Sequence, residues 1–298
     1  MPNQLQKIQN PKLKCENTSS EKRNRPKLLG QHFLINKFYL DKIVKSLDLQ
    51  ENDWIIEIGP GHGELTRLIA EKFQITNSKP HNSTSKLQII AIEKDPLLVS
   101  YIMNHMPSAN LEIIHGDALK ILPQIVSRPM IHDSGYKLVG NIPYYITGYL
   151  FRILADLEPK PKIIVFTIQK EVAERICAQP PKMNRLAASV QFWAKPEIID
   201  YIPKTAFSPK PKVDSAIIKL IPKSCIMDHV SYHKLKTMYY KLIKILFKQP
   251  RKTILNNLRA AKNTNLSEWR EKLLKIGINP NDRPQNLTIN QIITLSTP

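Results

Sequence analysis

Cysteine is scarce in this sequence. The chain of 298 residues has 3 cysteines, Cys15, Cys177 and Cys225, which lie far apart. An odd number of widely spaced cysteines argues against a disulfide framework and against a cysteine-rich zinc site. So few cysteines suit a reducing compartment, and we expect a cytoplasmic protein. The 8 histidines show no metal-ligand spacing, so we expect no metal.

Long hydrophobic runs are also missing. A membrane-spanning helix needs about 20 consecutive apolar residues, whereas the longest apolar runs here, such as 162–168, have the length of a strand. Residues 1–27 are polar and basic and lack the apolar segment of a secretory signal. We therefore expect no membrane partner.

Acidic residues are few relative to basic ones. Asp and Glu number 25 against 44 Lys and Arg, which gives a net charge of +19. Such an excess favours a polyanionic partner, with nucleic acid as the first candidate. The hydrophobic fraction of 42% is ample for a folded core, so a wholly disordered or collagen-like chain is excluded.

Short apolar runs alternate with helical spacing over most of the chain. The runs predict strands over 54–58, 87–92, 111–114, 137–140 and 163–168. The spacing predicts helices over 36–47, 64–73, 96–105 and 147–154. This alternation indicates a mostly parallel sheet with right-handed crossovers. The link between runs 197–202 and 213–221 is too short for a crossover helix, so we expect an antiparallel pair.

The sequence changes character near residue 222. Only helical periodicities occur from residue 229 on, and residues 204–272 hold 16 Lys or Arg and 4 Asp or Glu, a net charge of +12. We predict a disordered basic tail over 1–24, an α/β domain over 25–222 and a small all-α domain over 223–298. The polar segment 74–86 is expected to be a surface loop insertion.

A glycine-rich turn follows the first predicted strand. Gly59, Gly61 and Gly63 alternate there, although the chain has only 9 glycines. Glycines allow a tight turn and bring bare backbone against a ligand at a helix N-terminus. The spacing differs from the G-x-G-x-x-G of dinucleotide enzymes. Alone, the turn fits a ligand site and a plain strand-to-helix connection equally well.

Carboxylates follow the next two strands. Glu93 ends the second strand, where it can accept hydrogen bonds from both hydroxyls of a ribose; a solvated acid is the alternative. Asp117 follows the third strand, where it can bind the amine of an adenine or cap the next helix. Because open α/β sheets bind ligands at the carboxyl ends of their strands, we favour the ligand role for both.

The segment Asn141-Ile142-Pro143-Tyr144 follows the fourth predicted strand. An exocyclic amine of a nucleobase is a poor nucleophile because its lone pair is delocalised into the ring. The Asn141 oxygen and a backbone carbonyl of the turn can accept its two N–H bonds, which favours methylation of the nitrogen. Pro143 makes the turn rigid, and Tyr144 offers a ring for base stacking. A chance Pro-Tyr turn is the alternative.

Five segments together resemble the ribosomal RNA adenine N6,N6-dimethyltransferase family of the KsgA type. They are LGQHFL (29–34), EIGPGHGELT (57–66), NIPY (141–144), FSPKPKVDS (207–215) and QPRKT (249–253). The resemblance covers roughly residues 25–295. It implies a Rossmann-like class I S-adenosylmethionine-dependent methyltransferase sheet, mostly parallel with one antiparallel strand. A small all-α C-terminal domain for docking RNA would follow.

The resemblance also implies an activity. The family uses S-adenosyl-L-methionine and dimethylates N6 of two adjacent adenines near the 3′ end of small-subunit rRNA, so the assembling small ribosomal subunit is the implied partner. We expect a monomer. Three alternatives stay open: a large-subunit rRNA dimethyltransferase of the antibiotic-resistance type, a non-catalytic RNA-binding assembly factor, and a DNA adenine methyltransferase. The segment 207–215 favours the small-subunit enzyme, and Asn141 argues against lost chemistry.

Roles follow residue by residue from the same resemblance. The implied catalytic residues are Asn141, Pro143, Tyr144 and Phe207. The implied cofactor-binding residues are His32, Leu34, Gly59, Gly61, Glu93, Asp117 and Asn141. Phe207 would stack on the second face of the adenine, and its proline-rich loop leads us to expect an exposed ring.

A basic stripe near the C-terminus is the candidate RNA contact. The residues expected to bind phosphates are Arg251, Lys252, Arg259 and Lys262, and a solvated helix face is the alternative. Three positions depart from the family pattern: His32 replaces Asn, Ile142 replaces Leu and Pro250 replaces Arg. The first departure puts a side-chain contact from residue 32 to the cofactor in doubt.

Overall fold

The computed structural model describes residues 31–76, 87–106, 110–224, 228–260 and 265–297. The tail predicted over 1–24 lies outside these residues, as does most of the predicted insertion. Helix α2 (Glu64–Thr76) extends three residues beyond its predicted end, because no Gly or Pro interrupts the segment. No helix in the described part of the chain is long and apolar enough to cross a membrane.

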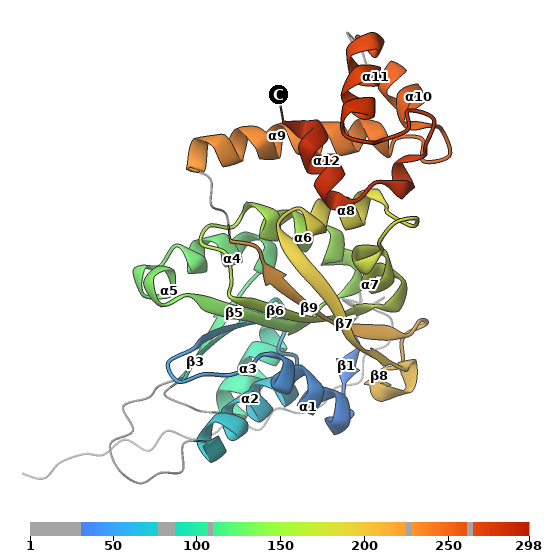
Figure 1. The fold of residues 1–298 in the computed structure, drawn as a ribbon. Coiled ribbons are helices and arrows are strands. Elements are labelled where there is room, and N and C mark those ends of the chain that lie inside the picture. Colours follow the sequence, from blue (N-terminus) through green and yellow to red (C-terminus); the bar gives the residue numbers. More distant parts are fainter. Residues whose placement is uncertain (1–30, 77–86, 107–109, 225–227, 261–264, 298) are drawn as a thin grey trace, which may run out of the picture. The chain divides into compact units, whose positions relative to one another are not determined.

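A seven-stranded sheet lies at the centre of the fold (Figure 1). Its strands in spatial order are β4 (Leu111–His115), β3 (Gln88–Glu93), β2 (Trp54–Ile58), β5 (Tyr136–Asn141), β6 (Ile163–Gln169), β9 (Ser215–Pro222) and β7 (Ala194–Ile202). Neighbours from β4 to β6 are parallel, and β9 is antiparallel to both β6 and β7. The predicted sheet and its one antiparallel strand are confirmed.

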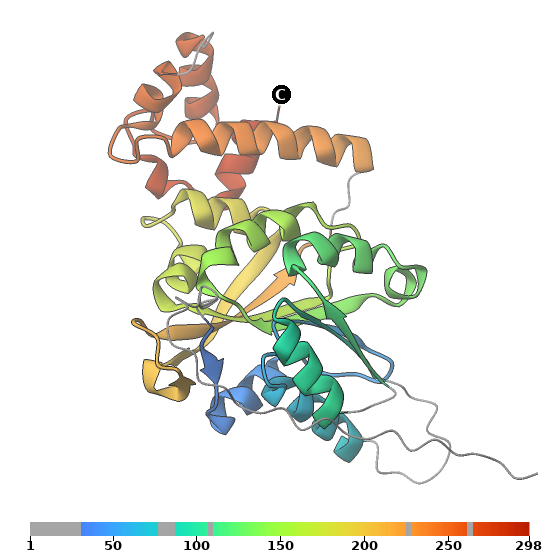
Figure 2. The same cartoon turned by 180° about the vertical axis from the view of Figure 1, so that it is seen from behind.

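Helices cover both faces of the sheet (Figures 1 and 2). One face packs on α1 (Lys37–Ser46) and α2 through strand residues such as Ile55 and Val139. The other face uses alternate residues such as Ile56 and Leu138, because successive side chains of a strand point to opposite faces. The helices that pack on that second face include α4 (Ala118–Val126), α6 (Thr147–Asp156), α7 (Lys170–Cys177) and α8 (Arg185–Gln191).

Side-chain caps fix several helix starts. Asn36 caps α1, and Asp95 caps α3 (Pro96–His105), each accepting a hydrogen bond from the backbone N–H two residues later. The apolar spacing of the sequence predicts both helices. It does not predict α5 (Pro129–Ser134), α7 or α8, because 6 to 8 residues are too few to show a helical period clearly.

A second, two-stranded sheet joins distant parts of the chain. Strand β1 (Phe33–Leu34) pairs antiparallel with β8 (Phe207–Ser208), which follows the 3₁₀-helix η2 (Lys204–Ala206). Leu34 lies opposite Phe207, and Phe207 is only 4% exposed. The expectation of an exposed Phe207 is therefore wrong, because a strand far away in the sequence covers the loop. Its proposed stacking role stays a prediction.

The C-terminal part is helical, as predicted. Its elements are α9 (His229–Leu246), α10 (Ile254–Arg259), α11 (Leu266–Lys275), the 3₁₀-helix η3 (Pro284–Asn286) and α12 (Ile289–Ser296). The Tyr239 hydroxyl on α9 donates a hydrogen bond to the Ala188 carbonyl of α8 at 2.9 Å. Buried residues of α9, α10 and α12 belong to the same apolar cluster as α6 and α8. The domain boundary at 222/223 stays a prediction.

Candidate active site

The carboxyl ends of four neighbouring strands lie at one edge of the sheet. Strands β4, β3, β2 and β5 are adjacent and parallel, and Asp117, Glu93, Gly59 and Asn141 lie at or just beyond their ends. Backbone hydrogen bonds connect the first three: Gly59 N–H donates to Ile92 at 3.0 Å, and Gly116 N–H donates to Glu93 at 2.7 Å. The predicted convergence of these segments is therefore present.

The glycines of the turn after β2 adopt backbone conformations in which other residues would be strained. Gly59, Gly61 and Gly63 have φ angles of +68°, +62° and +84°, in the left-handed region that favours glycine. A Cβ atom on Gly61 would also lie 2.8 Å from a ring carbon of Phe33 in β1. The turn thus approaches β1 closely and leads directly into the N-terminus of α2.

Glu93 holds this edge together. Its Oε1 accepts hydrogen bonds from the N–H groups of Lys94 and Asp95 at 2.8 and 2.9 Å, and its Oε2 accepts one from Gly61 N–H at 3.3 Å. The side chain is nearly fully buried. Burial raises the pKa of Glu93, and the three N–H donors act in the opposite direction. The carboxylate therefore links β3 to the glycine turn and retains lone pairs for a ligand hydroxyl.

Glu57 is a second buried carboxyl near the turn, and sequence reasoning assigned it no role. The Thr66 hydroxyl donates a hydrogen bond to its Oε2 at 2.6 Å. Burial, together with the nearby charges of Glu64 and Glu93, raises the pKa of Glu57 to about 7. The sequence does contain an indication of this residue, because Glu57 is an acid within the otherwise apolar run 54–58. A buried acid requires a hydrogen-bond partner.

Asp117 caps helix α4, the alternative that its sequence position offers beside a ligand role. Its Oδ1 accepts from Leu119 N–H at 3.0 Å at the start of α4, and its Oδ2 accepts from Lys94 Nζ at 3.1 Å. Partial burial raises the pKa of Asp117, but the hydrogen bonds from Lys94 and Leu119 outweigh it, so the pKa lies below its usual value. The ionised carboxylate can still accept from an adenine amine, and that role stays a prediction.

The amide of Asn141 has a fixed orientation. Its Nδ2 donates to the His32 carbonyl at 2.6 Å. Because a carbonyl can only accept, the nitrogen must face His32, and Oδ1 occupies the other arm of the amide. No partner of Oδ1 occurs among the described residues. His32 in turn donates from Nδ1 to the Pro209 carbonyl at 2.7 Å, so residues around 32, 141 and 209 meet.

The turn after Asn141 leaves one carbonyl available. Ile142 N–H donates to the Thr167 carbonyl at 3.0 Å. The Pro143 carbonyl accepts from Ile146 N–H at 3.1 Å, at the 3₁₀-helix η1 (Tyr144–Ile146). Within the described ranges no donor reaches the Ile142 carbonyl. The Asn141 side chain and the Ile142 backbone therefore supply two acceptors one residue apart.

Tyr144 connects the turn to β9. Its hydroxyl forms a 2.8 Å hydrogen bond with Ser215 Oγ, and its ring centroid lies 6.0 Å from that of His32. Burial raises the pKa of Tyr144, so the phenol is neutral. The structure thus brings together residues 31–34, 141–144 and 207–215, which belong to three motif segments of the sequence.

The predicted phosphate-binding residues lie elsewhere. Arg251 and Lys252 follow α9, and Arg259 ends α10; all three are exposed. None of them forms an ion pair with another described residue. Lys262 falls outside the described residues. Their contact with RNA stays a prediction.

Comparison with known proteins identifies the family. A family model described as ribosomal RNA adenine dimethylase matches residues 22–297. The chain belongs to the ribosomal RNA adenine dimethylase family. Relatives of this dimethylase include proteins named ribosomal RNA small subunit methyltransferase A. The one from Dehalococcoides mccartyi strain 195 is 37% identical over 88% of this chain and 84% of its own length. The one from Halothermothrix orenii is 34% identical over 90% of this chain and 86% of its own length.

Solved structures agree with this assignment. A dimethyladenosine transferase from Plasmodium falciparum superposes with a TM-score of 0.68 at 27% identity, covering 89% of this chain and 96% of that one. The 23S rRNA methyltransferase ErmE superposes with a TM-score of 0.67 at 21% identity, covering 89% of this chain and 98% of that one. At this low identity the similarity shows the fold alone. The expected fold class, enzyme class and use of S-adenosylmethionine are confirmed for this dimethylase.

The residues at the strand ends fit that cofactor. Glu93 offers a buried carboxylate for ribose hydroxyls, and Asp117 offers an acceptor for the adenine amine. The turn that contains Gly59, Gly61 and Gly63 leads into the N-terminus of α2, and the three glycines add no side chain there. These residues would hold S-adenosylmethionine, with Asn141 beside them.

Proposed function

We propose that this dimethylase transfers methyl groups to N6 of two adjacent adenines near the 3′ end of small-subunit rRNA. The observation that carries the proposal is the fixed amide of Asn141, whose oxygen and the Ile142 carbonyl form a pair of acceptors at the cofactor edge. The name shared by the relatives supports the small subunit as the substrate. The assembling subunit would be its partner, and the protein would act in the cytoplasm as a monomer.

The acceptor pair makes the amine reactive. Asn141 Oδ1 accepts one N–H bond of the adenine amine, and the Ile142 carbonyl accepts the other. Both pull the nitrogen away from conjugation with the ring, so its lone pair becomes available for attack. Because the amide is already oriented by His32, no reorganisation is needed during the reaction. When bound, S-adenosylmethionine supplies a methyl group on a positively charged sulfur.

The transfer of the second methyl group to the same nitrogen requires fewer hydrogen-bond acceptors. A monomethylated amine has one N–H bond left, so one of the two acceptors is sufficient to orient it. The nitrogen becomes acidic only after it has been methylated, so its proton can leave to water without a strong base. Tyr144 supports the base by stacking, with its hydroxyl fixed by Ser215.

The variant Asn141→Ala tests this mechanism. We expect methyl incorporation into small-subunit rRNA to fall about 100-fold or more, the usual effect of removing one preorganised polar group. RNA affinity should stay at the wild-type level. Asn290→Ala, at an exposed position of α12, is the matched control and should keep full activity. Unchanged incorporation in Asn141→Ala would refute the role given to this residue.

Substrate choice has a separate test. Small-subunit rRNA, large-subunit rRNA and DNA compete for the wild-type protein at matched salt with labelled cofactor, and methylated adenines are mapped by mass. We expect two adjacent dimethyladenosines in the small-subunit RNA alone. Methylation confined to large-subunit RNA or to DNA would favour the corresponding alternative, and binding without methylation would favour an assembly factor.

A further inference from the structure

A basic groove lies between α6, α8 and α9, outside the acceptor and cofactor sites. Its volume is about 600 Å³. The polar and charged side chains that line it are mostly cationic, and Gly148 lies at its rim. We call this cavity the α6–α9 groove, and its charged lining residues are Arg152, Asp156, Arg175, Arg185, Lys236 and Lys244.

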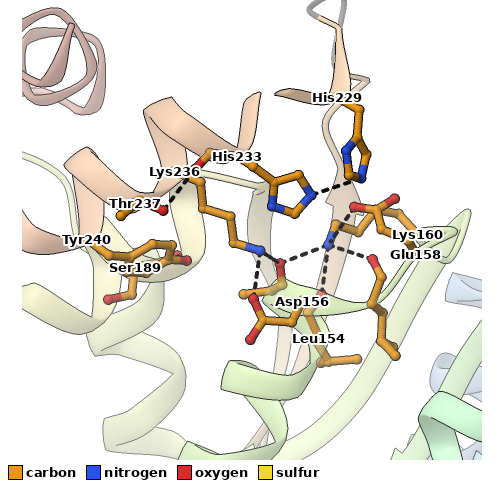
Figure 3. Close-up of polar contacts among 12 residues, drawn as sticks. Leu154, Asp156, Glu158, Lys160, Ser189, His229, His233, Lys236, Thr237 and Tyr240 are labelled. Carbon is orange, nitrogen blue, oxygen red and sulfur yellow. Dashed lines mark hydrogen bonds and ion pairs between the residues drawn. The ribbon is translucent and has the colours of Figure 1, made fainter. Parts of the chain in front are cut away.

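The single carboxylate of this lining is neutralised within the protein. Lys236 Nζ forms an ion pair with Asp156 at 2.7 Å and donates to the Ala155 carbonyl at 2.6 Å (Figure 3). Lys236 is largely buried in this arrangement. The three arginines and Lys244 form no ion pair with any residue that the structure describes. The groove therefore keeps an excess of positive charge that requires an anionic partner or solvent.

The groove begins near the start of α6, the helix that follows the acceptor turn. Gly148 is the second residue of α6 and follows Tyr144 by four positions. The groove then follows α6 to Asp156, a length of about 12 Å at 1.5 Å per residue. An RNA strand bound at both the acceptor turn and the groove would therefore run along α6.

An exposed aromatic ring lies on the same helix. Tyr149 is 62% exposed, and the Arg152 guanidinium lies 5.8 Å from the centre of its ring. Exposed tyrosine rings and arginine planes are the surfaces on which unpaired bases stack. An acidic peptide would explain the cations but not the ring. A single RNA strand accounts for both features.

We propose that the α6–α9 groove binds the phosphate backbone of the RNA strand next to the target adenines, and that Tyr149 stacks on a neighbouring base. The inference rests on RNA being the substrate, and it assigns a strand-binding role to residues that the acceptor site does not use. Arg152 and Arg185 contact phosphates, and the groove fixes the direction in which the strand leaves the site.

The first test removes charge from the groove. A single-stranded RNA with the sequence of the 3′ end of small-subunit rRNA is bound to Arg152→Gln/Arg185→Gln at several salt concentrations. Each lost phosphate contact lowers the slope of log K against log salt by about 0.7. We therefore expect a slope lower by about 1.4 and a KM for RNA at least about 10-fold higher, with kcat unchanged. The matched control is Lys45→Gln/Lys195→Gln, at exposed lysines outside the groove.

The second test adds a charge without removing a contact. A Cβ on Gly148 would meet no atom within 4 Å, so Gly148→Glu can fold normally and place a carboxylate at the rim. We expect weaker RNA binding in this variant and wild-type binding in Gly148→Ala. Tyr149→Ala should weaken binding about 5- to 150-fold with an unchanged salt slope, since stacking is worth about 1–3 kcal/mol per base.

The outcomes separate this proposal from the proposed function. If the wild-type protein methylates small-subunit RNA while the groove variants bind it normally, the groove proposal is wrong and the proposed function stands. If the wild-type protein fails to methylate that RNA, the proposed function is wrong. The RNA affinities of the groove variants still test the groove proposal in that case. Polyglutamate that displaces RNA fully, combined with wild-type binding by Tyr149→Ala, would assign the groove to an acidic protein instead.

Discussion

At the scale of the single residue, the carboxyl of Glu57 couples folding to pH. Burial raises its pKa from 4.5 to about 7, so between these values the folded protein holds a proton that the unfolded chain has released. Its contribution to stability is complete below about pH 4.5 and is lost as the pH rises through about 7. Glu57→Gln removes this titration and keeps an oxygen for the Thr66 hydroxyl.

Urea unfolding of both proteins at several pH values measures this effect. We expect the wild-type free energy of unfolding to fall by about 3 kcal/mol relative to Glu57→Gln between about pH 4.5 and pH 7. Other titrating groups are common to both proteins, so the difference isolates residue 57. Parallel pH curves for the two proteins would show that Glu57 is already ionised in the folded state.

Glu93 supports a second prediction at this scale. Glu93→Gln removes the negative charge that we assign to the cofactor ribose. A hydrogen bond to a charged group contributes about 1.5–3 kcal/mol, so affinity for S-adenosylmethionine should fall about 10- to 100-fold, as measured by calorimetry. Glu112→Gln on the adjacent strand, where Glu112 pairs with Arg128 on the surface, is the control. Equal affinities in the two variants would contradict the assignment.

The candidate site was predictable where it depends on strand ends. Glu93, Asp117 and Asn141 each follow an apolar run, and the rule that ligands bind at the carboxyl ends of parallel strands was enough to group them. The contact from Asn141 to His32 spans 109 residues, and the one from His32 to Pro209 spans 177. Local patterns carry no information on such pairs, so the orientation of the amide and the burial of Phe207 came from the structure alone.

At the scale of the element, two glycines differ in the space around them. A Cβ on Gly140 of β5 would lie 2.4 Å from the Ile58 carbonyl oxygen of β2, whereas one on Gly148 of α6 would meet nothing. We expect Gly140→Ala to lower the free energy of unfolding by about 1–3 kcal/mol, because the adjacent strand must shift. Gly148→Ala should raise it by about 0.5–1 kcal/mol by favouring the helix.

Urea unfolding under one set of conditions compares these two alanine variants. Because β2 leads into the glycine turn and β5 ends at Asn141, we also expect methyl transfer to fall in Gly140→Ala and to be retained in Gly148→Ala. A Gly140→Ala protein as stable as the wild type would mean that β2 and β5 are less closely packed than the structure shows.

Elements were predictable when they were long or carried a cap. Helix α3 begins and ends at its predicted residues because Asp95 caps it and Pro96 occupies its first position. Strands β1 and β8 have two residues each and no period of their own. Each of these strands forms only because the other pairs with it. The sequence of either segment alone therefore does not indicate a strand.

At the scale of the whole molecule, the basic residues are concentrated in the C-terminal helical part, whereas one apolar cluster includes residues of both that part and the α/β part. The helical, basic character of the C-terminal part was evident from its composition. The sequence did not indicate that residues such as Tyr239 and Leu242 of α9 would share one apolar cluster with α6 and α8. Periodicity shows that a helix has an apolar face, but it does not show which surface covers that face.

The net charge of +19 predicts salt-dependent RNA binding, to which the exposed basic residues near α10 should contribute. Replacing Arg251, Lys252 and Arg259 together by Gln should lower the slope of log K against log salt by about 2–3, since each phosphate contact accounts for about 0.7–0.9. Lys45, Lys162 and Lys195, replaced in the same way, provide a control with equal loss of charge at exposed positions. Anisotropy titrations with rRNA fragments over a range of salt concentrations measure both slopes. If the two triple variants lose the same amount, the protein is attracted by net charge alone, and the stripe near α10 is a solvated helix face.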